Sequence, residues 1–189
     1  MSKLRARRAI TTGALLELSL AALALALGAV AGISPLESLS LDIRATATGI
    51  LATLPLLALF QLAWSSRVAA LSKIRTELER LLPELFGDAS TVGLAVVSLA
   101  AGIGEELLFR GFLQAWLESL LGSFSGLVVA SVIFGAAHPI TGGYVVIAAL
   151  MGGYLGVLWQ ASGNLLAPIV THALYDLLVL WLLLRRKPG

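Results

Sequence analysis

The chain has 189 residues, of which 58% are hydrophobic and 13% are charged, and its formal net charge at pH 7 is +2. A soluble domain usually carries about twice that charged fraction, so the composition indicates an integral membrane protein. The small net charge and the absence of a basic stripe exclude nucleic acid as an expected partner. The absence of cysteine excludes disulfides, thiolate metal sites and thiol catalysis.

Six apolar stretches follow one another along the sequence, at about 10–33, 45–64, 90–110, 124–138, 143–160 and 163–184. The first, second and sixth are long enough to cross a bilayer, whereas the fourth and fifth are short, as is common inside a bundle. The predicted fold class is therefore all-α: a polytopic membrane helix bundle of about six transmembrane segments, with the lipid bilayer as its surroundings.

Residues 65–88 carry mixed charge and predict a short amphipathic helix on the cytoplasmic side of the membrane. We therefore treat 1–88 as two membrane helices followed by an amphipathic linker, and 89–189 as the core of a single membrane domain. The first stretch also resembles a signal peptide, with Ala29-Val30-Ala31 as a cleavage site. Because the apolar run is long for a signal and Glu17 interrupts it, we expect an uncleaved helix.

The basic residues predict the orientation. Eleven of the thirteen Lys and Arg residues lie before the first stretch, between the second and third, or after the sixth: Lys3, Arg5, Arg7, Arg8, Arg67, Lys73, Arg75, Arg80, Arg185, Arg186 and Lys187. Six crossings put these three regions on the same side. The positive-inside rule then predicts a multi-pass protein of the cell (plasma or inner) membrane with both termini in the cytoplasm.

The segment AGIGEELLFRGF, residues 101–112, introduces three charges into an apolar stretch. A charge at membrane depth costs about 3 kcal/mol on insertion scales, so each one needs a partner or a function. Glu106 and Arg110 are four residues apart, share a helix face and can pair. Glu105 points about 100° away from Glu106 and is left without a local partner. An interfacial position for all three charges is the alternative, because further polar residues follow.

Both histidines of the chain lie in apolar stretches. His138 ends the fourth stretch, and His172 lies in the sixth, with Asp176 four residues further on and on the same helix face. A single histidine in an apolar helix is more often structural than catalytic. Here Glu105, two histidines and an aspartate all occupy apolar stretches of a chain with few polar groups, so we interpret them as one shared site.

These residues resemble the CPBP family of intramembrane proteases, which includes the type II CAAX prenyl endopeptidases and bacterial proteins linked to bacteriocin processing and self-immunity. The family pattern is EExxxR, then FxxxH, then HxxxN or HxxxD. Within about 90–184 this chain has the three motifs in that order: Glu105-Glu106…Arg110, Phe134…His138 and His172…Asp176.

The resemblance implies an intramembrane endopeptidase that hydrolyses a peptide bond of a membrane-embedded or lipidated protein or peptide. The catalytic residues that it implies are Glu105, His138, His172 and Asp176, and the supporting residues are Glu106, Arg110 and Phe134. Glu105 would activate a water molecule with the help of His138. His172 and Asp176 would polarise the substrate carbonyl or stabilise the oxyanion, where a low dielectric strengthens each aligned dipole.

Two mechanisms are open. The same four residues, Glu105, His138, His172 and Asp176, include nitrogen and oxygen ligands that suit one zinc ion, although the chain lacks the HExxH motif. We lean slightly towards a site with no metal. Asp176 is the difficulty for an oxyanion hole, since an ionised Asp would repel the oxyanion that an Asn stabilises. Asp176 is therefore protonated, orients His172, or ligates a metal.

Functions of two other classes are also open. A non-catalytic membrane scaffold or a bacteriocin-immunity protein would keep the fold with an idle site. A small proton-coupled transporter would use intramembrane Glu, His and Asp as a relay, although we see no inverted repeat between the two halves of the chain.

Overall fold

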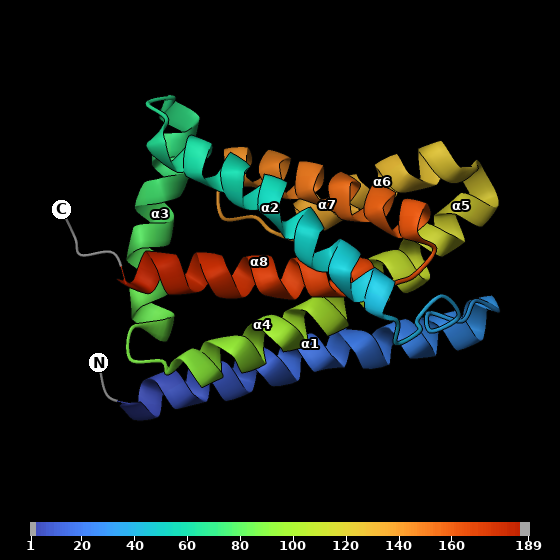
Figure 1. Cartoon of the computed structure of the whole chain (residues 1–189), viewed down its shortest axis with the longest axis horizontal. Helices are drawn as coiled ribbons and strands as arrows, with labels where there is room; N and C mark the ends of the chain where they lie inside the picture. The colour runs from blue at the N-terminus through green and yellow to red at the C-terminus, as the bar shows by residue number, and fades with distance from the viewer. Residues whose placement is uncertain (1–2, 186–189) are drawn as a thin grey trace.

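The computed structural model describes residues 3–185, and all the regular structure in that range is helical. The helices are α1 (Lys3–Ala31), α2 (Ile43–Ser65), α3 (Ala69–Phe86), α4 (Thr91–Glu106), the π-helix η1 (Leu107–Gln114), α5 (Ala115–Leu121), α6 (Ser123–Ala136), α7 (Gly142–Ser162) and α8 (Leu166–Arg185). Figure 1 shows the long helices running side by side, with α3 crossing one end of the bundle. The all-α prediction is confirmed.

Five helices among the described residues are long and apolar enough to cross a membrane: α1, α2, the continuous helix Thr91–Leu121, α7 and α8. The protein is therefore a multi-pass membrane protein. The fourth predicted stretch is short, since α6 has 14 residues. The prediction of a short fifth stretch is wrong. Thr141 caps the N-terminus of α7, and the helix continues for 21 residues before Gly163 ends it in a left-handed conformation.

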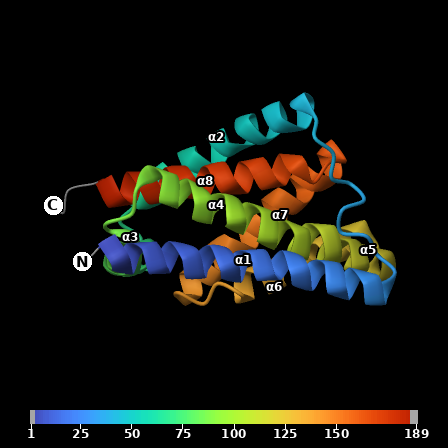
Figure 2. The ribbon, with the colours of Figure 1, turned by 90° about the horizontal axis from the view of Figure 1, so that it is seen from below.

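Helix α4 lies at the centre of the arrangement. It packs against α1 on one side and α8 on the other, while α2 packs along α8 and α6 packs along α7. Figure 2 shows α1 and α4 running next to each other. Glycines permit these close approaches: Gly104 lies against the backbone of Glu17, and Gly102 lies against the backbone carbonyl of Ile169. Residues near the end of α4 are consequently enclosed by other helices.

The third predicted stretch forms one helix that changes its geometry instead of breaking at a glycine. After Glu106 the α-helical hydrogen bonds give way to the wider π-helix η1, which continues to Gln114. In a π-helix each hydrogen bond joins residues five apart, so side chains point in directions that α-helical spacing does not predict. Six of the eight residues of η1 are buried, and Arg110 is one of them.

Helix α3 corresponds to the predicted amphipathic segment. Ile74 is buried, whereas Arg80 and Glu77 form an exposed ion pair at 2.9 Å. The first turn of α1 and the last turn of α8 lie at the same end of the bundle as α3 (Figure 1). Arg186 and Lys187, which contribute to the predicted orientation, lie outside the described residues.

Candidate active site

The charges of segment 101–112 are enclosed by the helix bundle. Relative exposure is 9% for Glu105, 0% for Glu106 and 2% for Arg110. Nη1 of Arg110 donates a hydrogen bond to Oε1 of Glu106 at 2.6 Å, and Nη2 donates to the carbonyl oxygen of Gly152 on α7 at 2.9 Å. The predicted pairing of Glu106 with Arg110 is confirmed, and burial excludes an exposed position for these side chains.

Glu106 has a second partner that the local spacing did not predict. Nδ1 of His172, on α8, donates to the same Oε1 of Glu106 at 2.7 Å. Because an ionised carboxylate only accepts hydrogen bonds, this contact places a proton on Nδ1. The other ring nitrogen, Nε2, then points away from Glu106. One carboxylate therefore joins α4 to η1 and α8, and through Arg110 the connection reaches α7.

Glu105 and His138 face each other. Nδ1 of His138 donates to the carbonyl oxygen of Phe134 at 2.8 Å, and a carbonyl only accepts, so this nitrogen carries a proton. Nε2 lies 3.6 Å from Oε2 of Glu105, which is longer than a hydrogen bond. Oε2 is buried and has no hydrogen-bond partner in the described part of the chain. The two atoms therefore face each other without a direct hydrogen bond.

Phe134 lies between the charged groups and is 2% exposed. The guanidinium carbon of Arg110 is 4.5 Å from the centroid of its ring, a cation–π contact. The ring centroids of His138 and His172 are 4.6 Å and 6.1 Å away. One aromatic side chain thus contacts both histidines and the buried arginine, as a supporting residue would.

Asp176 lies one turn beyond His172 on α8, as the spacing predicts. Its Oδ2 is 3.6 Å from Nε2 of His172, again too far for a hydrogen bond. The four predicted catalytic residues are therefore arranged as two pairs, Glu105 with His138 and His172 with Asp176.

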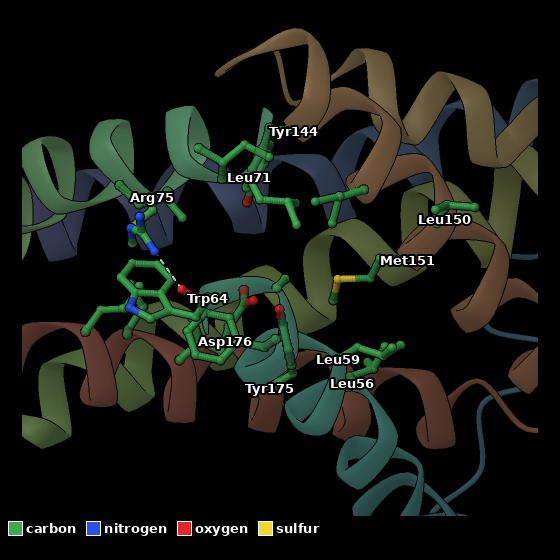
Figure 3. Close-up of a pocket in the computed structure, with 18 of the residues that line it drawn as sticks. Leu56, Leu59, Trp64, Leu71, Arg75, Tyr144, Leu150, Met151, Tyr175 and Asp176 are labelled. Carbon is green, nitrogen blue, oxygen red and sulfur yellow. Dashed lines mark hydrogen bonds between the residues drawn. The ribbon is translucent and has the colours of Figure 1, made fainter. Parts of the chain in front are cut away.

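Asp176 also lines a cavity of about 610 Å³ between α2, α3, α7 and α8. Most of the wall is apolar, and Tyr144, Tyr175 and Arg75 are among its polar residues. Figure 3 shows these side chains around the cavity, with Arg75 donating to the carbonyl oxygen of Trp64 at 2.8 Å. The cavity reaches the predicted site at Asp176, and its chemistry suits an apolar ligand.

A further acidic residue of the site region comes from α1. Glu17 packs through its backbone against Gly104, and its Oε2 is buried with no hydrogen-bond partner among residues 3–185. Its side chain interacts electrostatically with Glu105, His172 and Asp176. In the sequence, Glu17 argues only against a cleaved signal peptide and is not predicted as a site residue. A carboxylate in an apolar stretch is energetically costly, and this cost could have marked Glu17 as a functional residue. The sequence does not show which residues lie next to it.

The predicted ligands of a zinc ion form two pairs in the structure, each with its nitrogen and oxygen atoms 3.6 Å apart. Zinc takes three or four protein ligands at about 2.0–2.2 Å. Among residues 3–185 no three His, Asp or Glu side chains converge as a group that would hold a metal ion. The two pairs described above are separate, and Nδ1 of His172 is already bonded to Glu106.

The fold and the site define a class: polytopic membrane proteins with carboxylates and histidines enclosed in a helix bundle. Residues 87–178 match the family model described as Rce1-like, type II CAAX prenyl endopeptidase. The match is to a family of CAAX-type proteases, and it confirms the resemblance found in the sequence. The match includes all the predicted site residues and leaves α1, α2 and α3 outside. No curated protein and no solved structure matches the chain.

Proposed function

We propose that the protein is an intramembrane endopeptidase that hydrolyses a peptide bond of a membrane-associated protein or peptide. The observation that carries the proposal is the pair of buried Glu105 and partly buried His138, whose Oε2 and Nε2 atoms face each other at 3.6 Å. Other polar groups nearby, on Glu106, Arg110 and His172, are already hydrogen-bonded to one another. The family match over the same residues supports a protease.

In this proposal Glu105 is the general base. It removes a proton from a water molecule that Nε2 of His138 orients, while the water oxygen bonds to the carbonyl carbon of the substrate. The carbon–nitrogen bond then breaks, and Glu105 returns the proton to the leaving amine. The products are a peptide with a new carboxylate and one with a new amine, so no other reactant is consumed.

The remaining residues position this chemistry. Glu106 and Arg110 hold the ring of His172 through Nδ1, and Phe134 supports both histidines. We propose that His172 and Asp176 orient the substrate carbonyl from the other side, where the cavity begins. The apolar wall of the cavity would bind hydrophobic side chains or a lipid group on the substrate, as the CAAX prenyl description of the family suggests.

The test is cleavage of a membrane-associated peptide by the purified protein in lipid vesicles. Glu105→Gln keeps the shape of the side chain and removes the base, so we expect hydrolysis to be lost and thermal stability to stay near that of the wild type. Glu79→Gln, on the exposed face of α3, is the matched control and should retain activity.

Three results of this test would contradict the proposal. Full activity of Glu105→Gln would show that the base is wrongly assigned. A wild type that cleaves no peptide would favour a scaffold or an immunity protein. Proton flux into vesicles that depends on Glu105, without cleavage, would favour a transporter.

We also propose that catalysis requires no metal. If Asp176 were a zinc ligand, the purified protein would contain about one zinc, and Asp176→Asn would lower both the zinc content and the activity. For the metal-free site we expect activity to survive a strong chelator. Asp176→Asn should then be tolerated or increase turnover, because a neutral group replaces a charge that repels an oxyanion.

For location, we propose a cell-membrane protein with both termini in the cytoplasm. The common position of the ends of α1 and α8 beside α3 supports this orientation (Figure 1). Reporter fusions after Gly189 and within 65–88 should both report the cytoplasm. A signal from the opposite side for either fusion would contradict it.

A further inference from the structure

The proposed hydrolysis, on which this inference rests, produces an oxyanion on the substrate carbonyl. Such an oxyanion needs hydrogen-bond donors aimed at it. The side chains of the cluster that can donate already have acceptors. Arg110 donates to Glu106 and Gly152, and His172 donates to Glu106 through Nδ1. His138 donates to a backbone carbonyl through Nδ1.

The pair expected to bind the carbonyl does not supply a free donor either. Nε2 of His172 faces Oδ2 of Asp176 at 3.6 Å, so the carboxylate competes with a substrate oxygen for any proton on that nitrogen. An ionised Asp176 would also repel an oxyanion. The oxyanion therefore needs a neutral hydrogen-bond donor from a helix other than α8.

Tyr144 has the position and the chemistry for this role. It lies in the first turn of α7, where its backbone N–H is fixed by the side chain of Thr141 at 3.1 Å. Its ring centroid is 6.5 Å from that of His138, and it packs against the buried cluster of Phe109, Phe134 and Ala148. The ring is thus held by its surroundings on the side of the catalytic pair.

The hydroxyl of Tyr144 is available. It makes no hydrogen bond within the described residues, and the side chain lines the same cavity as Asp176. Figure 3 shows the two side chains on the wall of this cavity. The side chain of Tyr144 also interacts electrostatically with Asp176 and Glu105, one residue of each pair of the site.

We propose that Tyr144 is a further catalytic residue, whose hydroxyl donates a hydrogen bond to the oxyanion of the tetrahedral intermediate. No bond is made or broken at the hydroxyl, and the phenol stays neutral throughout. The donor comes from α7 and therefore compensates for a carboxylate at position 176, where an asparagine would donate directly.

The experiment compares Tyr144→Phe with Tyr175→Phe in the full chain. Tyr175 lines the same cavity, next to Asp176, so its variant measures what the loss of any tyrosine hydroxyl from the cavity wall costs, and Glu79→Gln is the control outside the cavity. Removing one oxyanion donor costs about 100- to 1,000-fold in kcat. We expect Tyr144→Phe to lose that much kcat with KM almost unchanged, whereas Tyr175→Phe, a change in the wall that binds the substrate, should act mainly on KM. A general effect on packing would raise KM or lower the unfolding temperature instead.

A second measurement uses a peptide phosphonate, a tetrahedral anion that mimics the intermediate. Its affinity should fall with Tyr144→Phe by about the factor lost in kcat/KM. The affinity of the intact substrate peptide, measured on Glu105→Gln with and without Tyr144→Phe, should not change. A wild-type kcat in Tyr144→Phe, or equal losses in both tyrosine variants, would overturn the assignment.

If Tyr144→Phe does not fold, fluorotyrosines placed at position 144 keep the ring and the hydroxyl. The kcat should then change progressively with the acidity of the phenol at position 144 but not at position 175, and the lack of such a trend would overturn the inference. Failure here is distinguishable from failure of the proposed function. The latter is decided by the wild type and Glu105→Gln, which do not involve Tyr144.

Discussion

Two ion pairs of the same chemistry lie in contrasting regions of the molecule. In the bundle, Arg110 and Glu106 are four residues apart, with N and O atoms at 2.6 Å and side-chain exposures of 2% and 0%. On α3, Arg80 and Glu77 are three residues apart at 2.9 Å, with exposures of 62% and 31%. The distances are similar, so the environment decides what each pair contributes.

The difference lies in what remains when one partner is removed. On α3 the surviving charge can turn to water, and measured contributions of such pairs are about 0–1 kcal/mol. In the bundle the surviving charge stays buried. Because Glu106 also accepts from His172, and Arg110 also donates to Gly152, a loss at one residue affects four helical segments. The buried pair thus holds several helices together, while the similar pair on the amphipathic helix contributes little to stability.

The largest expected effect follows from Glu106→Gln. This substitution leaves Arg110 uncompensated and weakens the bond that holds His172, so we expect a loss of about 3–5 kcal/mol in the free energy of unfolding. The measurement is unfolding in mixed micelles by titration with a denaturing detergent. A loss below about 1 kcal/mol would mean that the buried pair behaves like the surface pair.

Arg110→Lys tests the geometry of the connection while keeping the charge. Lysine is a compact cation and cannot reproduce the planar fork that donates to both Glu106 and Gly152 while lying over the ring of Phe134. We expect a loss of about 1.5–3 kcal/mol, the value of one hydrogen bond to a charged group. Wild-type stability in the same unfolding titration would show that charge alone suffices.

Glu17→Gln tests an acid whose buried Oε2, like that of Glu106, accepts no hydrogen bond within the described residues. The amide supplies a donor in a region that holds the unpaired Oε2 of Glu105, so we expect unfolding to become harder by about 1 kcal/mol. Glu17→Ala removes the carboxylate without adding a donor, so its free energy of unfolding should rise by less than that of Glu17→Gln. A loss of stability in Glu17→Gln would mean that the carboxylate is needed as an acceptor.

The smallest effect is expected for Glu77→Gln on α3. The loss should be below about 1 kcal/mol in dilute buffer, since both side chains are substantially exposed. It should shrink further at about 1 M salt, where the Debye length is about 3 Å, whereas the loss in Glu106→Gln should hardly change. Unfolding titrations at two salt concentrations make the comparison, and a similar response to salt in both variants would contradict it.

Much of the fold was predictable from the sequence because its signals are local. The hydropathy of successive stretches gave the helices, including α3 as an amphipathic element and α6 as a short one. The pairing of Glu106 with Arg110 followed from a spacing of four residues. The order of the three motifs gave the family, and the assignment of catalytic roles to Glu105, His138, His172 and Asp176 stays a prediction.

Only the tertiary structure showed how these residues are connected. The bond from His172 to Glu106 spans 66 positions, and Glu17 reaches the site because α1 crosses α4 at Gly104. The position of Tyr144 on the cavity depends in the same way on how α7 packs against its neighbours. Helix spacing gives the face on which a side chain lies, but not the helix that this face meets. That choice is made by the packing of whole helices against one another.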